Sequence, residues 1–150
     1  MNARLLTLLL FIFLSGCGGG SSSSGGAGDK EDLILALGDS IGSGYATGGY
    51  AFPELVSIQM AIPVVNDSRP GISAEEGVLG AEELIAQHNP RYIIALLGTN
   101  NALGAAGEAD GAVSALEYLA NICDENGIIC IIGTLPPITL ASSLNGNAQK

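Results

Sequence analysis

The sequence predicts an α/β fold in which a doubly wound parallel sheet lies between two layers of helices. Three observations support this prediction: four short apolar segments of strand length, longer segments of helical periodicity between them, and turn-forming residues at the boundaries. Segments that are apolar on both faces are typical of parallel strands covered by helices on either side. Because strands and helices alternate along the chain, right-handed crossovers would join them into one sheet.

Strands and helices are expected in turn along the chain. The predicted strands span 33–37, 62–65, 92–97 and 128–132, and the predicted helices span 52–60, 73–87 and about 108–125. Ser73 followed by Glu76 is a capping-box pattern, which marks the start of the second helix. Asn126 and Gly127 form a helix stop before the fourth strand.

Length, charge and cysteine content limit the possible functions. At 150 residues, 47% of them hydrophobic, the chain is long enough for one domain with a hydrophobic core. Its net charge of −10 argues against binding to nucleic acid, because five basic residues cannot form a patch that neutralises many phosphates. The three cysteines show no metal-ligand spacing, so neither a metal nor another cofactor is expected.

The first 32 residues are expected to be a targeting segment and a tether. Residues 1–16 combine a basic start with an apolar run too short to span a bilayer, which predicts a bacterial lipoprotein signal peptide. Cys17 ends a lipobox-like sequence and would be lipidated; an ordinary secretory signal with a chance cysteine is the alternative. Residues 17–32, rich in glycine and serine, would tether a domain spanning 33–150. The protein would then be an exported, membrane-anchored lipoprotein.

Two of the three cysteines fall late in the predicted domain. Cys123 lies near the end of the third predicted helix, and Cys130 lies in the fourth predicted strand. In an exported compartment the two could form a disulfide. Two buried free thiols are an equally good interpretation, and the sequence leaves both open.

Polar and glycine-containing segments follow the first three predicted strands. The ligand site of a doubly wound sheet lies beyond the carboxyl ends of its strands, so these segments are expected to open onto one face. A glycine-rich nucleotide loop is the competing interpretation after the first strand, but neither a dinucleotide nor a phosphate-loop motif fits. The three segments are Gly38-Asp39-Ser40, 66–71 and Gly98-Thr99-Asn100-Asn101.

This ordered set of segments resembles the conserved blocks of the SGNH (GDSL-type) hydrolases, over residues from about 33 to 137. The resemblance implies a flavodoxin-like sheet and an acyl-ester hydrolase of the small esterase, lysophospholipase and thioesterase type. It makes Ser40 the nucleophile, and it assigns the oxyanion hole to the backbone amides of Ser40 and Gly71 and the side-chain amide of Asn100. These residue types suit acyl transfer, which needs an accessible oxygen nucleophile and neutral donors facing the developing negative charge.

Three neighbours of these residues are weaker candidates. Asp39 is interpreted as a residue that braces the loop rather than as the catalytic acid, because it directly precedes Ser40. Asn101 replaces the aspartate usual at this place in the family, which leaves its bonding open, and Thr99 is a supporting candidate only.

The loops around the nucleophile are expected to be open to solvent. Gly38 before Ser40, with Gly42 and Gly44 after it, would keep the approach to the ester carbonyl free of bulky side chains. Residues 67–69 are interpreted as a solvated turn that leads to Gly71.

The family's catalytic base is a histidine three residues after an aspartate near the end of the domain, and this chain contains no such pair. The only histidine, His88, falls at the end of a predicted helix just before the third strand. That position is at the amino ends of the strands, whereas Ser40 is at the carboxyl ends. A strand separates the two by about 17 to 20 Å, far beyond the reach of a general base.

The absent pair predicts a domain truncated at its carboxyl end. A fragment of an enzyme is the favoured explanation, and a short lipoprotein that has lost its catalytic end is the alternative. In the first case the protein hydrolyses a small-molecule or lipid ester, although this 150-residue chain would be inactive. In the second it is a non-catalytic lipoprotein that binds an acyl or glycan ligand. A monomer is expected.

Overall fold

The computed structural model describes residues 29–45, 47–48 and 50–135 of the chain. The predicted signal peptide, Cys17 and most of the predicted tether lie outside the described residues. Within the described part, no helix is both long enough and apolar enough to cross a membrane.

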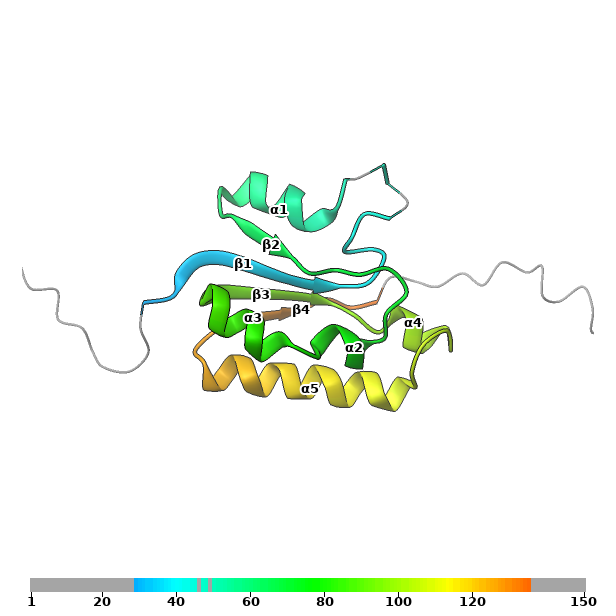
Figure 1. The fold of residues 1–150 in the computed structure, drawn as a ribbon. Coiled ribbons are helices and arrows are strands. Elements are labelled where there is room, and N and C mark those ends of the chain that lie inside the picture. Colours follow the sequence, from blue (N-terminus) through cyan, green and yellow to red (C-terminus); the bar gives the residue numbers. More distant parts are fainter. Residues whose placement is uncertain (1–28, 46, 49, 136–150) are drawn as a thin grey trace, which may run out of the picture.

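A parallel sheet forms the centre of the fold (Figure 1). Its four strands are β1 (Glu31–Gly38), β2 (Val64–Asn66), β3 (Pro90–Leu96) and β4 (Ile129–Ile132). They are ordered β2-β1-β3-β4, and every neighbouring pair is parallel. The chain thus moves outward from β1 to β2 and then crosses to β3 on the other side of β1. This is the flavodoxin-like doubly wound arrangement, and the predicted fold class is confirmed.

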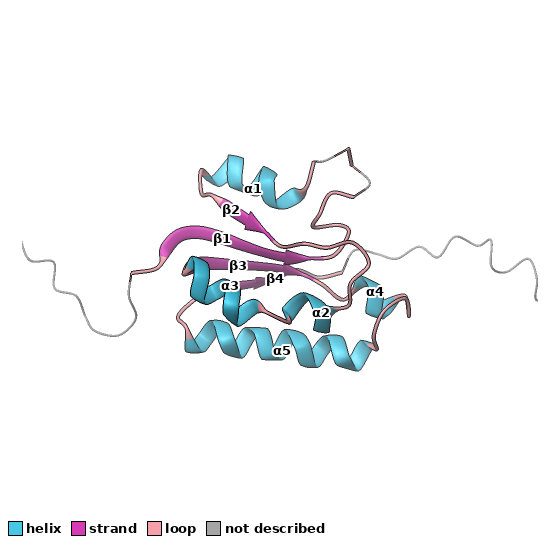
Figure 2. Cartoon of the chain, in the orientation of Figure 1, coloured by secondary structure: helices cyan, strands magenta, loops and turns pink. Residues whose placement is uncertain are grey.

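Helices lie on both faces of the sheet (Figures 1 and 2). Helix α1 (Phe52–Met60) lies on one face and contacts β2. The other face carries α2 (Ala74–Val78), α3 (Ala81–His88) and α5 (Ala109–Glu125). A single helical turn, α4 (Thr99–Ala102), follows β3 at the carboxyl edge of the sheet.

The hydrophobic core lies between the sheet and the helices α2, α3 and α5. Leu35 and Leu37 of β1, Ile93 of β3 and Leu119 of α5 are each at most 1% exposed. Full burial of one such side chain contributes about 1.5–3 kcal/mol to folding. The packed core therefore fixes the strands, and with them the position of every loop at the strand ends.

The helix predicted over 73–87 is wrong in one respect, because the structure divides it into α2 and α3. Gly80 adopts a left-handed backbone conformation with φ +92°, which ends the helical path, and Leu79 turns outward and is 80% exposed. Just before this break in the helix, α2 packs closely against the end of β3. A Cβ at Gly77 would lie only 2.6 Å from Cδ2 of Leu97. The predicted capping box of Ser73 and Glu76 is confirmed.

The boundaries of several elements differ slightly from the predicted ones. Helix α1 has the predicted bounds. Strand β1 begins at Glu31, two residues before the predicted start of the domain, because the Glu31 amide donates to the carbonyl of Asn89 at 2.9 Å. The predicted helix stop is confirmed: Asn126 caps α5, and Gly127 has φ +63°.

Candidate active site

Ser40 lies in a tight turn directly after β1. Its backbone carbonyl accepts hydrogen bonds from the Ser43 hydroxyl and the Tyr45 amide, both at 3.1 Å. Asp39 is completely buried, and its Oδ1 accepts a hydrogen bond from the Ile41 amide at 2.9 Å. The prediction that Asp39 braces this loop is confirmed. The turn leaves Ser40 itself partly exposed.

Glycines around this turn allow close packing. A Cβ at Gly38 would lie 2.7 Å from Oγ of Ser68, and a Cβ at Gly42 would overlap the same atom. Gly44 packs in the same way, since a Cβ there would lie 2.9 Å from the amide nitrogen of Ala51. Close packing thus requires glycine at 38, 42 and 44, and an open approach to the ester carbonyl stays a prediction. Neighbouring segments occupy the space that a side chain would fill at each of these glycines.

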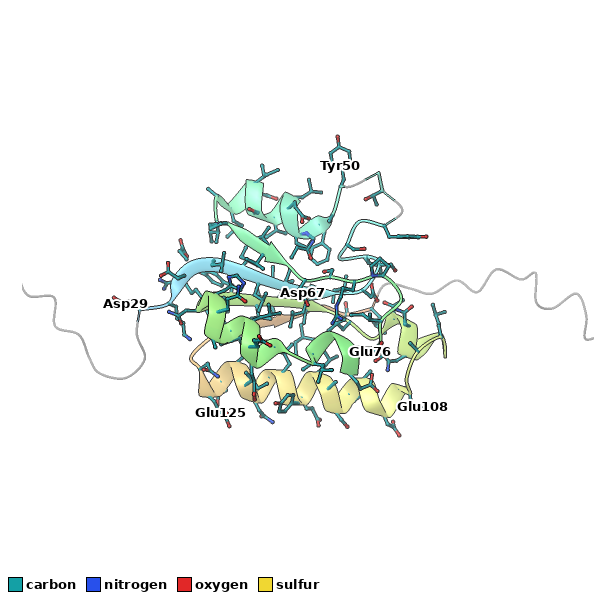
Figure 3. The ribbon with its side chains drawn as sticks, viewed as in Figure 1. Asp29, Tyr50, Asp67, Glu76, Glu108 and Glu125 are labelled. Atoms are coloured by element: carbon teal, nitrogen blue, oxygen red, sulfur yellow. The ribbon has the colours of Figure 1, made fainter. Side chains whose placement is uncertain are left out.

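The loop after β2 is tied to the end of β1. The Asp67 amide donates to the carbonyl of Ala36, and the Arg69 amide donates to the carbonyl of Gly38, both at 2.9 Å. The side chain of Asp67, labelled in Figure 3, forms an exposed ion pair at 3.8 Å with Arg69, as a solvated turn predicts. Ser68 between them differs, because its Oγ is buried and has no hydrogen-bond partner among the described residues.

The segment after β3 is joined to the loop after β2 through Asn100. Nδ2 of Asn100 donates to the carbonyl of Ile72 at 2.8 Å, and Ile72 directly follows Gly71. Gly71 has φ +83°, a left-handed conformation that favours glycine, and a Cβ there would meet no atom within 4 Å. The amide of Asn100 carries a second N–H, which has no acceptor among the described residues.

The structure therefore brings the three predicted segments to one edge of the sheet. The register places Ala36 opposite Asn66 and Gly38 opposite Leu96, so the strands β2, β1 and β3 end side by side. Among the described residues, neither the Ser40 amide nor the Gly71 amide donates a hydrogen bond to another protein atom. Unpaired backbone amides beside a side-chain amide are the donors from which oxyanion holes are built.

Asn101 has a structural role that the sequence did not predict. Its side chain is 4% exposed, and its Oδ1 accepts a hydrogen bond from the Ala74 amide at 2.9 Å. Its Nδ2 donates to Oε2 of Glu75 at 2.9 Å and to the carbonyl of Glu108 at 3.0 Å. These bonds tie α4 to the first turn of α2 and to the start of α5. Because Asn101 follows Asn100, they also fix the position of the candidate oxyanion donor.

Thr99, the other supporting candidate, starts α4. Its Oγ1 is buried and has no hydrogen-bond partner among the described residues. The hydroxyl thus faces the protein interior, and we give Thr99 no part in the chemistry.

We expect Glu75 to make the stability of the fold depend on pH in the acid range. The hydrogen bond from Asn101, followed by one from the backbone amide of Glu75, holds the pKa of this carboxyl below its ordinary value of 4.5. A carboxyl with a lowered folded-state pKa stabilises the fold above its ordinary pKa, and that contribution is lost as the pH falls through the folded-state pKa. Thermal melts below about pH 5 should therefore show a steeper loss for the wild type than for Glu75→Gln. Identical pH dependence of the two melting temperatures would contradict this assignment.

His88 lies at the opposite edge of the sheet from Ser40. It is the last residue of α3, and the next residue, Asn89, accepts a hydrogen bond from Glu31 at the start of β1. Ser40 follows the other end of this strand, which is eight residues long. At about 3.3 Å per residue the two edges are roughly 25 Å apart. The structure thus separates His88 from Ser40, as the sequence predicts.

An apolar cavity lies at the carboxyl ends of β3 and β4, between the segments that follow these strands and the first half of α5. Its volume is about 400 Å³, and its lining includes Asn101 together with the apolar side chains of Leu97, Val113, Leu116 and Leu135. A second cavity, of about 580 Å³, lies among α2, α3 and α5 and is lined by no residue of the three strand-end segments. Within the described residues, no group of three or more histidine, cysteine, aspartate or glutamate side chains could hold a metal ion.

Comparison with known proteins identifies this fold. No protein-family model matches the chain. Thioesterase 1/protease 1/lysophospholipase L1 of Escherichia coli K12 is 36% identical over 75 residues, which are 48% of this chain and 36% of that protein. A G-D-S-L family lipolytic protein from Desulfitobacterium hafniense has a similar structure, with a TM-score of 0.67 and 19% identity over 75% of this chain and 65% of that chain. AlinE4, an SGNH-hydrolase family esterase, gives a TM-score of 0.58 and 23% identity over 75% of this chain and 64% of that chain.

The chain has the fold of the SGNH hydrolases. The part that matches spans about a third of the length of the curated relative and about two thirds of the length of these solved structures. In the SGNH fold, as in other doubly wound sheets, ligands are expected at the carboxyl edge of the strands. Ser40, Gly71 and Asn100 all lie at that edge, and His88 does not.

Proposed function

We propose that the chain is part of a serine acyl-ester hydrolase of the SGNH type. Oγ of Ser40 attacks the carbonyl carbon of the ester, and the amides of Ser40 and Gly71 and the side chain of Asn100 stabilise the resulting oxyanion. The observation that carries this proposal is the hydrogen bond from Asn100 to the carbonyl of Ile72, at 2.8 Å. This bond holds Asn100, in the segment after β3, close to Gly71, in the loop after β2. The similarity to a protein named as a thioesterase and lysophospholipase supports the same class of reaction.

The Ser-His route needs a base that takes the proton from Oγ of Ser40 and later gives it to the leaving alcohol. Asp39 is a poor substitute, because its Oδ1 already accepts the hydrogen bond that braces the turn and its side chain is buried. His88 lies at the other edge of the sheet. We therefore propose that the histidine and its aspartate belong to a longer form of this protein.

The apolar cavity near Asn101 suits the acyl group of the substrate. Its walls come mostly from aliphatic side chains, and Asn101 in its lining directly follows the candidate oxyanion donor. We also propose that lipidation of Cys17 holds the domain at an exported membrane face, where lipid esters are available. Cys17 lies outside the described residues.

Ester turnover and the downstream gene sequence test this proposal. The 150-residue chain should hydrolyse p-nitrophenyl esters no faster than its Ser40→Ala variant, because its one histidine, His88, lies at the other edge of the sheet. The coding region beyond Lys150 should encode an Asp-x-x-His sequence. If the 150-residue chain hydrolyses the ester and Ser40→Ala abolishes this activity, a histidine from a longer form of the protein is not required. A downstream region without that sequence would remove the hydrolase proposal.

A non-catalytic acyl- or glycan-binding lipoprotein is the second candidate. The observation that favours it is the apolar cavity at the strand ends of a chain whose histidine lies elsewhere. It requires the 150-residue chain to be stable alone, so a cooperative melt whose midpoint rises with an added fatty acid would support it. Aggregation of the purified chain would exclude it.

A further inference from the structure

Cys123 and Cys130 lie where helix α5 meets strand β4. The buried stripe of α5 includes Leu119, Ile122 and Cys123, which belong to the core between this helix and the sheet. In β4, Ile129 and Ile131 are 54% and 48% exposed, whereas Cys130 between them packs against that same core. The two cysteines therefore enter one layer of the protein from opposite walls.

The chain between them reverses direction within a few residues. Helix α5 ends at Glu125, at the opposite end from Glu108 (Figure 3). The Ile128 amide then donates to the carbonyl of Cys123 at 2.8 Å, which brings the start of β4 back under the last turn of the helix. Cys130 is the second residue of β4 and is paired in register with Ile93. The backbone thus holds Cys123, in the last turn of α5, over the start of β4, where Cys130 lies.

The two side chains are free thiols; Cys123 belongs to the hydrophobic core, and Cys130 packs against that core. A hydrogen bond from Cys123 lowers the pKa of the Cys130 thiol, while that bond and burial raise the pKa of Cys123. Cys130 is also the more exposed of the two. Since the thiolate is the attacking species in disulfide exchange, Cys130 is the thiol suited to react first.

We infer that Cys123 and Cys130 form a disulfide that joins α5 to β4 when the protein meets a disulfide donor. The thiolate of Cys130 attacks one sulfur of the donor, and the other donor sulfur leaves as a thiolate. Cys123 then loses its proton and attacks Sγ of Cys130, which expels the second donor thiolate. Two protein thiols are oxidised to one disulfide, and the donor disulfide is reduced to two thiols.

This cross-link would act on the stability of the fold and is independent of the chemistry at Ser40. It would prevent the last turn of α5 from separating from β4, whose far end borders the apolar cavity. A disulfide that closes a loop this short restricts the unfolded chain and is expected to raise the melting temperature by roughly 5–10 °C.

Oxidation of the full chain with oxidised glutathione, followed by peptide mapping without reduction, tests the inference. Cleavage after Glu125 separates the two cysteines, so a linked pair of peptides can arise only through a disulfide. We expect one linked pair that contains Cys123 and Cys130 and is two hydrogens lighter than the separate peptides. We also expect a rise in melting temperature that dithiothreitol reverses.

Two single variants serve as matched controls. Cys123→Ala and Cys130→Ser should give neither the linked peptides nor the reversible rise in melting temperature. The main readout comes from the wild-type chain, so it does not depend on whether either variant folds. Recovery of only free thiols, glutathione adducts or peptides linked to Cys17 from the wild type would overturn the inference.

Discussion

Replacing Asn101 with aspartate is expected to lower the free energy of unfolding by about 3 kcal/mol. The asparagine donates through Nδ2 to the carboxylate of Glu75 and to the carbonyl of Glu108, and its side chain is buried. An aspartate has nearly the same shape but no N–H, so it would place a carboxylate oxygen against two acceptors, one of them charged. Urea denaturation at neutral pH measures the loss.

The same site supplies the control for this prediction. In the double variant Asn101→Asp/Glu75→Gln, the glutamine amide can donate to the new carboxylate, so part of the lost stability should return. The single variant should also recover relative to the wild type as the pH falls below about 5, because repulsion by Glu75 raises the pKa of the introduced carboxyl. If Asn101→Asp were as stable as the wild type at neutral pH, the two hydrogen bonds that Asn101 donates through Nδ2 could not be what holds α4 in place.

The position of the candidate site follows from local sequence together with sheet topology. Each of the three segments directly follows an apolar strand, and parallel strands end at the same edge, so Ser40, Gly71 and Asn100 could be placed together without any side-chain coordinates. The exclusion of His88 rests on the same argument, because a residue that precedes a strand lies at the other edge. Alternation of strand and helix was sufficient for both inferences.

Features that depend on contacts between distant segments could not be predicted in this way. Nothing near Gly42 in the sequence indicates that Ser68, from another loop, fills the space beside it. Gly80 lies within an apolar pattern of helical period, so the sequence predicts one continuous helix there. The helix breaks at Gly80, where the backbone is left-handed, and Gly77 just before it packs closely against Leu97. The hydrogen bonds of Asn101 reach two helices that start far apart in the sequence. The sequence therefore showed that an asparagine replaces the usual aspartate, but it did not indicate what this asparagine binds.

In a longer form of the protein that hydrolyses esters, Ser40→Ala is expected to reduce kcat/KM by at least about 10⁴-fold, because no acyl-enzyme can form. Asn100→Ala removes one donor of the oxyanion hole and should reduce kcat by about 10²–10³-fold. Asn100 also donates to the carbonyl of Ile72, so thermal melts must accompany the kinetics. A loss of kcat with an almost unchanged melting temperature and KM would separate the catalytic role from the structural one.

His88→Ala is the matched control for these kinetics, because it removes the one imidazole of the 150-residue segment at the edge away from Ser40. We expect it to leave kcat/KM and its dependence on pH unchanged. A loss comparable to that of Ser40→Ala would mean that His88 reaches the nucleophile, which the parallel sheet between them does not allow in this fold. The comparison thus tests the geometry of the proposed site and not only the identity of its nucleophile. If the downstream histidine proposed above is the base, its replacement should reproduce the Ser40→Ala effect while His88→Ala does not.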